Sequence, residues 1–221
     1  HGSHRSPSGH QGGGLLPKNV LSMRSIAQVC QEADRFFMHQ SPVHQAAEAL
    51  SKELRRLEIP YAIAGALSAN AHGHTRTTAD VDVLLRREDL KKFKRSRLGL
   101  GYVELFVGSK GMRDTEHNVK IDVLLSGEFP GDGKPKPVAF PDPIEAGEPD
   151  VNGVSYLKLS WLMQLKLASG MTAAHRPQDL YDVIQLIRVN QLSVRYGQEL
   201  PPYVRDKYAE LWALAQVDED Y

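Results

Sequence analysis

The sequence predicts an α+β fold, in which a β-sheet is flanked by helices and further helical segments stand at both ends of the chain. Three short apolar runs, at residues 61–64, 80–85 and 119–125, have the composition of buried strands. Much of the remaining chain repeats apolar residues every three to four positions, which is typical of amphipathic helices. With 221 residues, 41% hydrophobic and 24% charged, the chain is long enough for one domain with an appendage or for two small domains.

The N-terminal part divides into a tail and two helices. Residues 1–20 are rich in Gly, Ser, Pro and His, and we expect them to form a disordered tail that begins with a cloning remnant. Residues 21–58 are expected to form N-terminal helices at 22–39 and 42–57, with Cys30 buried in the first. Pro60 then ends the helical pattern.

Residues 59–158 are expected to form the central domain, because strand-like runs are concentrated there. The elements expected in order are a strand at 61–64, a short helix at 66–72, a strand at 80–85, a basic helix at 86–97, a strand at 102–107, a polar turn at 108–118 and a strand at 119–125. A proline-rich stretch at 129–153 follows, expected to be loop with one short edge piece at 138–140, and then a strand at 154–157. Such a loop can be functional or a passive connection.

Residues 159–221 are expected to form a C-terminal helical region. Ser160 is placed to cap a helix that Gly170 would end. Pro177 and Pro202 are placed in the first turns of two further helices, to about residues 189 and 216.

Two aspartates stand two residues apart in the strand at 80–85. Successive side chains of a strand point to opposite faces, so Asp80 and Asp82 share one face while Val81 and Val83 point into a core. Two carboxylates side by side repel each other unless a cation lies between them, and hard oxygen ligands suit Mg²⁺. The alternative is a pair of solvated aspartates at the mouth of an edge strand.

A third aspartate, Asp122, stands among aliphatic residues in the strand at 119–125. The same alternation puts Lys120 and Asp122 on one face. A lone acid in such a strand needs a partner. That partner is either Lys120 or Arg113 in a structural ion pair, or a metal ion shared with the other two aspartates.

The segment Arg76-Thr77-Thr78-Ala79-Asp80-Val81-Asp82, preceded by a strand, Gly65 and an alanine-rich helix, resembles the nucleotidyltransferase superfamily, nearest the branch of AbiEii-type toxins. The resemblance covers roughly residues 59–187 and implies a polymerase-β-like mixed sheet. Ala66 departs from the family, which usually has Gly or Ser there. Lys166 and the segment from Arg176 to Asp182 resemble a later family motif, in which Arg176, Asp179 and Asp182 would fix the helices to the catalytic domain.

The resemblance implies transfer of an NMP from an NTP to a hydroxyl acceptor, with release of pyrophosphate. Asp80, Asp82 and Asp122 would be the catalytic, metal-binding residues, holding Mg²⁺ or Mn²⁺. The nucleotide-binding residues implied are Gly65, Ala66, Arg76, Thr78 and Lys166. The acceptor, a protein, an RNA or a small molecule, is left open, as are the identity of the NTP and the oligomeric state.

The composition limits the partners and the compartment. The 27 basic and 27 acidic residues balance, so nucleic acid would need a local patch. The seven basic residues of 86–97 are such a patch, read either as a solvated helix face or as an acceptor-binding surface. The single cysteine fits a reducing, cytoplasmic location, and no apolar run is long enough to span a membrane. Because Ala66 offers no hydroxyl, the alternative function is a catalytically silent protein of this fold that binds nucleotide or a protein partner.

Overall fold

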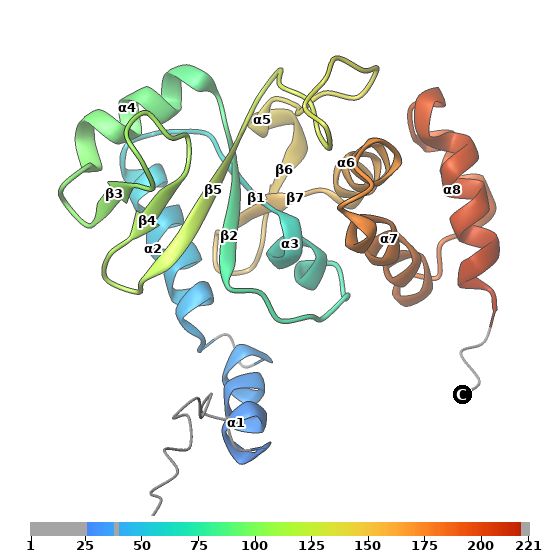
Figure 1. Ribbon diagram of the computed structural model, residues 1–221, viewed down its shortest axis with the longest axis horizontal. Coiled ribbons are helices and arrows are strands. Elements are labelled where there is room, and N and C mark those ends of the chain that lie inside the picture. The colour runs from blue at the N-terminus through green and yellow to red at the C-terminus, as the bar shows by residue number, and fades with distance from the viewer. Residues whose placement is uncertain (1–25, 38–39, 218–221) are drawn as a thin grey trace, which may run out of the picture.

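A seven-stranded mixed sheet forms the centre of the molecule (Figure 1). The computed structural model describes residues 26–37 and 40–217. The strand order is β3-β4-β5-β2-β1-β7-β6. The strands are β1 (Ala62–Ala64), β2 (Asp80–Leu85), β3 (Tyr102–Glu104), β4 (Met112–Asp114), β5 (Val119–Leu125), β6 (Gly147–Pro149) and β7 (Ser155–Leu157). With helices on both faces, the predicted α+β class is confirmed.

The middle of the sheet combines both strand directions. β2 runs parallel to β5 and antiparallel to β1, while β1 is parallel to β7. The outer pairs β3–β4, β4–β5 and β6–β7 are antiparallel. β2 and β5 thus lie side by side in the same direction, and residues at equal depth on the two strands face the same side.

One face of the sheet is covered by α2 (Pro42–Arg56) and α4 (Arg87–Arg97). The Ser41 hydroxyl accepts a hydrogen bond from the backbone N–H of His44 and caps α2, whose first residue is a proline. Alternate residues of the inner strands point into this core: Ile63, Val81, Val83, Leu85, Ile121, Val123 and Leu125. Burial of these aliphatic side chains fixes the strand register, because a slip of one residue would bury the aspartates instead.

On the other face α3 (Gly65–Ala71) packs on the strands, and α6 (Leu159–Thr172), α7 (Pro177–Val189) and α8 (Pro202–Ala215) form a helical layer beside it. Helices α6 to α8 share a core with Ala62, Ala64, Leu84 and Leu157 of the sheet. A 3₁₀ helix at Val194–Glu199, which the sequence did not predict, joins α7 to α8. Figure 1 shows these C-terminal helices beside the sheet, with α6 nearest to it.

Short elements account for several corrections. β3 ends at Glu104, where an extension to residue 107 was expected, and β4 lies inside the expected polar turn. Residues 138–140 form no strand; α5 (Pro143–Ala146) and β6 follow them instead. A strand of three residues is too short for its alternation of apolar and polar residues to be recognised, so local periodicity does not reveal it.

Helix α6 also differs from the expectation at both ends. It begins at Leu159 with Lys158 at the N-cap position and no side-chain cap, so Ser160 is not the cap. It continues through Gly170 to Thr172. Gly170 serves packing and does not end the helix, since a Cβ there would lie 2.5 Å from Leu180 of α7. A glycine that allows two helices to approach has the same sequence signature as one that ends a helix.

The N-terminal helix α1 (Ile26–Phe37) projects from the body of the molecule in Figure 1. Cys30 is exposed on it, so the expected burial of this cysteine is wrong. The predicted tail at residues 1–20 lies outside the described residues. Within the described ranges, no helix is both long and apolar enough to cross a membrane.

Candidate active site

The two central parallel strands bring two of the predicted aspartates together. Asp82 of β2 stands directly opposite Asp122 of β5, and Asp80 stands opposite Lys120. Val81 and Val83, which alternate with the aspartates of β2, are fully buried in the core on the α2 side. The predicted alternation is therefore confirmed, and all three carboxylates lie on the sheet face that carries α6 and α7.

Gly65 holds the turn from β1 into α3 close to Asp82. Ala64 pairs with Asp82 across β1 and β2. Gly65 has a φ of +60°, and a Cβ on it would lie only 2.0 Å from Oδ2 of Asp82. Glycine is needed here for its backbone conformation and for the space that the carboxylate occupies.

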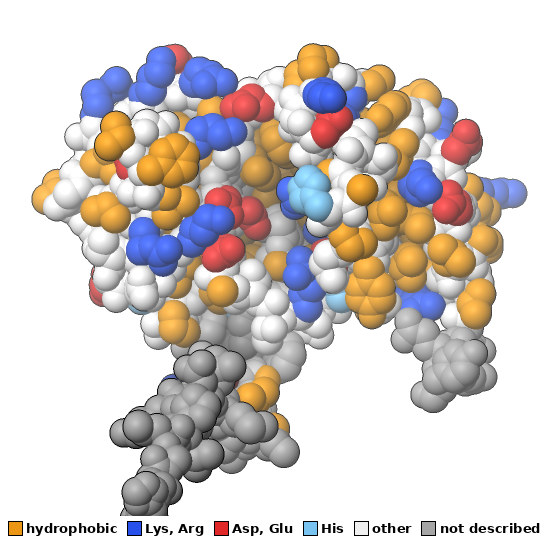
Figure 2. Space-filling model, viewed as in Figure 1, with side chains coloured by type: hydrophobic (Ala, Val, Ile, Leu, Met, Phe, Trp, Pro, Cys, Tyr) orange, Lys and Arg blue, Asp and Glu red, His pale blue; other side chains and the backbone are white. Residues whose placement is uncertain are grey.

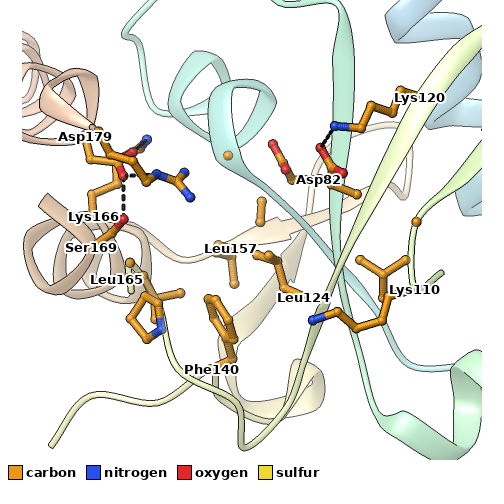
Figure 3. Close-up of a pocket in the computed structure, with 18 of the residues that line it drawn as sticks. Asp82, Lys110, Lys120, Leu124, Phe140, Leu157, Leu165, Lys166, Ser169 and Asp179 are labelled. Carbon is orange, nitrogen blue, oxygen red and sulfur yellow. Dashed lines mark hydrogen bonds and ion pairs between the residues drawn. The ribbon is translucent and has the colours of Figure 1, made fainter. Parts of the chain in front are cut away.

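A cavity of about 730 Å³ opens above this pair. The sheet supplies Asp82 and Asp122, and the opposite wall is formed by α6 and the start of α7 (Figure 3). Loops before β4 and after β5 complete it, the second packed so tightly on α6 that a Cβ on Gly131 would lie 2.9 Å from the carbonyl oxygen of Ser169. Figure 2 shows a hollow between the sheet and the C-terminal helices, with acidic and basic side chains gathered at its edge.

The charge of Asp82 is poorly compensated. Its pKa is raised to about 6, chiefly by burial and also by the charges of Asp122 and Asp80, against the lowering effect of Lys166 and Arg176. Repulsion between carboxylates is the expected consequence of placing acids on adjacent strands of one face. A cation bound between them would relieve it.

Asp122 has a partner in the chain itself. Its Oδ2 lies 3.0 Å from Nζ of Lys120, and both side chains are more than a third exposed. This hydrogen bond is the main reason that the pKa of Lys120 is raised. Arg113, the other candidate, instead donates to Asn118 at 3.3 Å. Of the alternatives left open by the sequence, the ion pair with Lys120 is present.

The donor set suits a hard divalent cation, although the side chains do not converge as a triad. Mg²⁺ is commonly held by one or two carboxylates together with substrate phosphates, and Asp82 and Asp122 offer such a pair. Among the described residues, no group of three or more His, Cys, Asp or Glu side chains is arranged to hold a metal ion. The site formed by all three aspartates stays a prediction.

Lys166 reaches the cavity from α6 and is held by buried acids of α7. Its Nζ lies 2.7 Å from Oδ2 of Asp182 and 3.2 Å from Oδ1 of Asp179. Asp179 also accepts from Ser169 at 2.6 Å and pairs with Arg176 at 2.9 Å. The cavity wall opposite the sheet therefore carries two cations, Lys166 and Arg176, that share the carboxylate of Asp179.

Asp182 joins α7 to the loop between α3 and β2. It accepts hydrogen bonds from Nη2 of Arg76 at 3.2 Å and lies 3.0 Å from Nε2 of His74. Complete burial of this side chain opposes its ionisation, but Lys166, Gln178 and Arg76 outweigh burial and hold its pKa below the usual range. The predicted role of Asp182 in fixing the helices to the sheet domain is confirmed by these contacts.

The remaining predicted nucleotide-binding residues lie at different distances from the cavity. Gly65 and Lys166 line it, whereas Ala66, Arg76 and Thr78 do not, and neither does Asp80. Ala66 is buried in α3. The Thr78 hydroxyl accepts a hydrogen bond of 3.3 Å from the backbone N–H of Asp80, the first residue of β2.

Several lining residues were not identified from the sequence as part of a site. They come from the two loops at the cavity mouth and are Phe106, Lys110, Pro130 and Phe140. The density of proline and glycine in residues 129–153 signalled an ordered loop, and the structure places part of that loop at the cavity. Nothing in the short turn before β4 distinguishes a cavity-lining side chain from a solvated one.

Comparisons with known proteins find similarity at the level of structure. No protein-family model matches the chain, and no curated protein sequence matches it. The chain is similar to the antibiotic-resistance factor ANT(2'')-Ia, whose solution structure aligns at 16% identity and a TM-score of 0.35 over 74% of this chain and 77% of that one. The crystal structure of ANT(2'')-Ia with adenylyl-2''-tobramycin aligns at 13% identity and a TM-score of 0.36, over 74% and 82%. At these values the activity must be inferred from the cavity's own residues, and the likeness to AbiEii-type toxins stays a prediction.

Proposed function

We propose that this protein is a metal-dependent nucleotidyltransferase that moves an NMP from an NTP to a hydroxyl acceptor and releases pyrophosphate. One observation carries the proposal: Asp82 and Asp122 stand opposite each other on adjacent parallel strands, at the floor of a cavity whose far wall presents Lys166 and Arg176. Carboxylates on one side and fixed cations on the other suit a phosphate chain with its bound cation.

The carboxylates have two roles in this proposal. Asp82 and Asp122, with Asp80 two residues earlier on the same face, would hold Mg²⁺ or Mn²⁺, which supplies charge neutralisation at the phosphates and a lowered pKa of the acceptor hydroxyl. Asp122 lies at the more open side of the pair and can also accept the acceptor's proton. Lys120, its present partner, is free to turn to a phosphate oxygen when a bound cation replaces it.

The nucleotide would lie between the sheet and α6. Lys166 and Arg176 lower the pKa of Asp82, so their charge acts across the cavity on the point where the triphosphate is to be bound. Gly65 leaves the turn without a side chain there. Ala66, Arg76 and Thr78 do not line the cavity, so we propose that they support the nucleotide site through the turn and the loop that carry them.

A second candidate function is nucleotide binding without transfer. The ion pair between Lys120 and Asp122 favours it, because a lysine that neutralises Asp122 permanently would leave Asp82 without a partner carboxylate for a metal ion. The two candidates differ in turnover and in the effect of Mg²⁺ on NTP affinity.

The decisive experiment is a transfer assay. The protein is incubated with each α-labelled NTP, Mg²⁺ and a cell extract, and labelled protein, RNA and small molecules are separated. Transfer that requires Mg²⁺ and disappears in Asp82→Asn supports the first candidate. NTP binding by calorimetry with no labelled product in any fraction would overturn it in favour of the second. Loss of growth inhibition in Asp82→Asn, if the wild type inhibits growth when expressed, would test the proposed AbiEii-type toxicity.

A further inference from the structure

An exposed aromatic side chain stands at the mouth of the cavity. Phe106 lines the cavity and is 70% exposed, while Val107 beside it is 97% exposed and does not line it. A single exposed apolar residue is unremarkable in a folded protein, but apolar surface at the rim of a cavity commonly marks a ligand-binding groove. The Phe106 ring belongs to neither of the two hydrophobic cores formed by the described residues.

The loop that carries Phe106 is well anchored. The backbone N–H of Leu105 donates to the carbonyl of Gly111 at 3.2 Å, and that of Ser109 donates to Phe106 at 2.9 Å. Below the loop, Nζ of Lys94 bonds to the carbonyl of Ser109 and to Glu104, the latter at 2.8 Å. These contacts hold the ring at the cavity mouth, so binding of a ligand against it would require little ordering of the loop.

The same rim is positively charged. Lys110 lines the cavity and is half exposed, and its Nζ lies 3.3 Å from Glu128. Arg87 of α4 pairs with the same carboxylate, also at 3.3 Å, so two cations share one acid. In Figure 3 the Lys110 side chain reaches along the apolar wall formed by Leu124 and Phe140. Planar apolar surface and surplus positive charge therefore occur together.

The direction of the proposed reaction assigns this rim to the acceptor. In an in-line displacement the attacking and leaving oxygens lie on opposite sides of the phosphorus. The leaving pyrophosphate is directed to Lys166 and Arg176 on the helical wall. Figure 3 shows Lys120 and Lys110 on the other side of the cavity from Lys166, and this is the side from which the attacking hydroxyl must come.

We propose that the rim formed by Phe106, Lys110, Leu124 and Phe140 is the acceptor site, and that it selects a hydroxyl compound carrying both a planar ring and an anionic group. This rests on the proposed function. The ring packs on Phe106 and the apolar wall, Lys110 binds the anion, and the hydroxyl lies beside Asp122. The acceptor oxygen bonds to the α-phosphorus, the bond from that phosphorus to the pyrophosphate oxygen breaks, and the hydroxyl proton passes to Asp122.

The test compares three probes that differ in one feature each. They are 5′-AMP, with ring, phosphate and hydroxyls; ribose 5-phosphate, without the ring; and adenosine, without the phosphate. Binding of each is measured by calorimetry with the nucleotide site saturated by a non-hydrolysable NTP analogue, and again without it. We expect 5′-AMP to bind about tenfold more tightly than either partial probe, in keeping with the usual strength of base–aromatic stacking and of charge-assisted hydrogen bonds.

Substitutions at two exposed positions should remove one binding feature of the site each without disturbing the core. Phe106→Ala should lower 5′-AMP affinity to that of ribose 5-phosphate, and Lys110→Ala should lower it to that of adenosine. Val107→Ala, in the same loop, and Lys91→Ala, on an exposed lysine of α4, are matched controls expected to leave all three affinities unchanged. Affinities that are the same in wild type, Phe106→Ala and Lys110→Ala would overturn the proposal.

Failure of this inference can be told from failure of the proposed function. If labelled NMP is transferred in the wild type and both rim variants transfer it to 5′-AMP at the wild-type rate, the reaction stands and the acceptor site is wrong. If no NMP is transferred, the calorimetric comparison of 5′-AMP with its partial probes still decides whether the rim binds a ring-bearing anion.

Discussion

Two groups of acids, a short distance apart in the fold, are treated in opposite ways. Asp179 and Asp182 are buried on α7, and each has several partners: Lys166 for both, Ser169 and Arg176 for the first, and Arg76 and His74 for the second. Asp80 and Asp82 of β2 form no ion pair with any residue that the structure describes, and the charge of Asp82 is opposed by burial and by other acids.

The difference separates acids that serve the fold from acids that serve a ligand. Buried carboxylates that are fully bonded stabilise one arrangement of helices, and loss of one partner leaves charge unpaired. Carboxylates that repel one another lower the stability of the free protein, and such an arrangement is typical of functional sites, where a ligand supplies the missing charge. Asp179 and Asp182 therefore form a fold group, and Asp80 and Asp82 form a ligand group.

The largest effect is expected for Asp82→Asn. If Asp82 belongs to the ligand group, the rate of NMP transfer should fall by about two to four orders of magnitude, while the free energy of unfolding without Mg²⁺ stays the same or rises. The measurements are initial transfer rates and urea unfolding in the presence of a chelator. A destabilised variant with near wild-type transfer would place Asp82 in the fold group instead.

Asp182→Asn should have the opposite result. Removing the charge leaves Arg76 without its buried partner and Lys166 with Asp179 alone, so we expect the free energy of unfolding to fall by about 3–5 kcal/mol. Urea unfolding followed by circular dichroism measures it. Glu88→Gln, which breaks an exposed ion pair with Lys91 at 3.2 Å, is the control and should cost no more than about 1 kcal/mol. Equal effects of the two substitutions would contradict the distinction.

Lys166 pairs with both acids of the fold group and also lines the cavity, so its substitution tests a structural role and a ligand-binding role together. Lys166→Met keeps the length of the side chain but leaves Asp179 and Asp182 facing an apolar group, so a loss of about 3 kcal/mol in the free energy of unfolding is expected. NTP affinity, measured by calorimetry below the onset of unfolding, should also fall if Lys166 binds phosphate. A destabilised variant with unchanged NTP affinity would restrict Lys166 to a structural role.

The sequence predicted one of these groups better than the other. Strand alternation alone placed Asp80 and Asp82 on one face of their strand and Asp122 on the same face as Lys120 in another, because a period of two is imposed by the backbone. The expectation that Asp122 lies near the other two came only with the resemblance to a family, since nothing local determines which strands become neighbours, and the facing of Asp82 and Asp122 across two parallel strands came only with the structure.

The partners of the buried acids Asp179 and Asp182 could not be predicted from strand or helix periodicity. Lys166 lies 13 and 16 residues before Asp179 and Asp182, and that spacing has no meaning until α6 and α7 pack together. Gly170 shows the same limit, because its role is set by Leu180 on the next helix. The cavity mouth was least predictable, since Phe106 and Lys110 stand in a turn whose position depends on the three-residue strand β4 and on Lys94 beneath it.

The smallest expected effect concerns pH, and it gives the two groups opposite signs. The pKa of Asp82 is raised from 3.8 to about 6 in the folded protein, so the native state binds a proton more tightly than the unfolded chain does. The contribution of Asp82 to the free energy of unfolding therefore falls as pH rises from 3.8 to about 6. The pKa of Asp182 is lowered from 3.8, so its contribution is complete above that value and is lost as pH falls through the folded pKa.

Urea unfolding of the wild type, Asp82→Asn and Asp182→Asn across this range tests both signs. The advantage of Asp82→Asn over the wild type should grow by about 1–2 kcal/mol toward neutral pH, after allowance for solvent screening, and then stay constant. The free energy of unfolding of Asp182→Asn should stay below that of the wild type by a constant amount, and this difference should shrink only at the acidic end of the pH range. Since repulsion by Asp122 and Asp80 is part of the cause at Asp82, Mg²⁺ should remove the advantage of Asp82→Asn at neutral pH by stabilising the wild type alone. An advantage that is independent of pH and of Mg²⁺ would show that Asp82 is a solvated acid and not part of a ligand site.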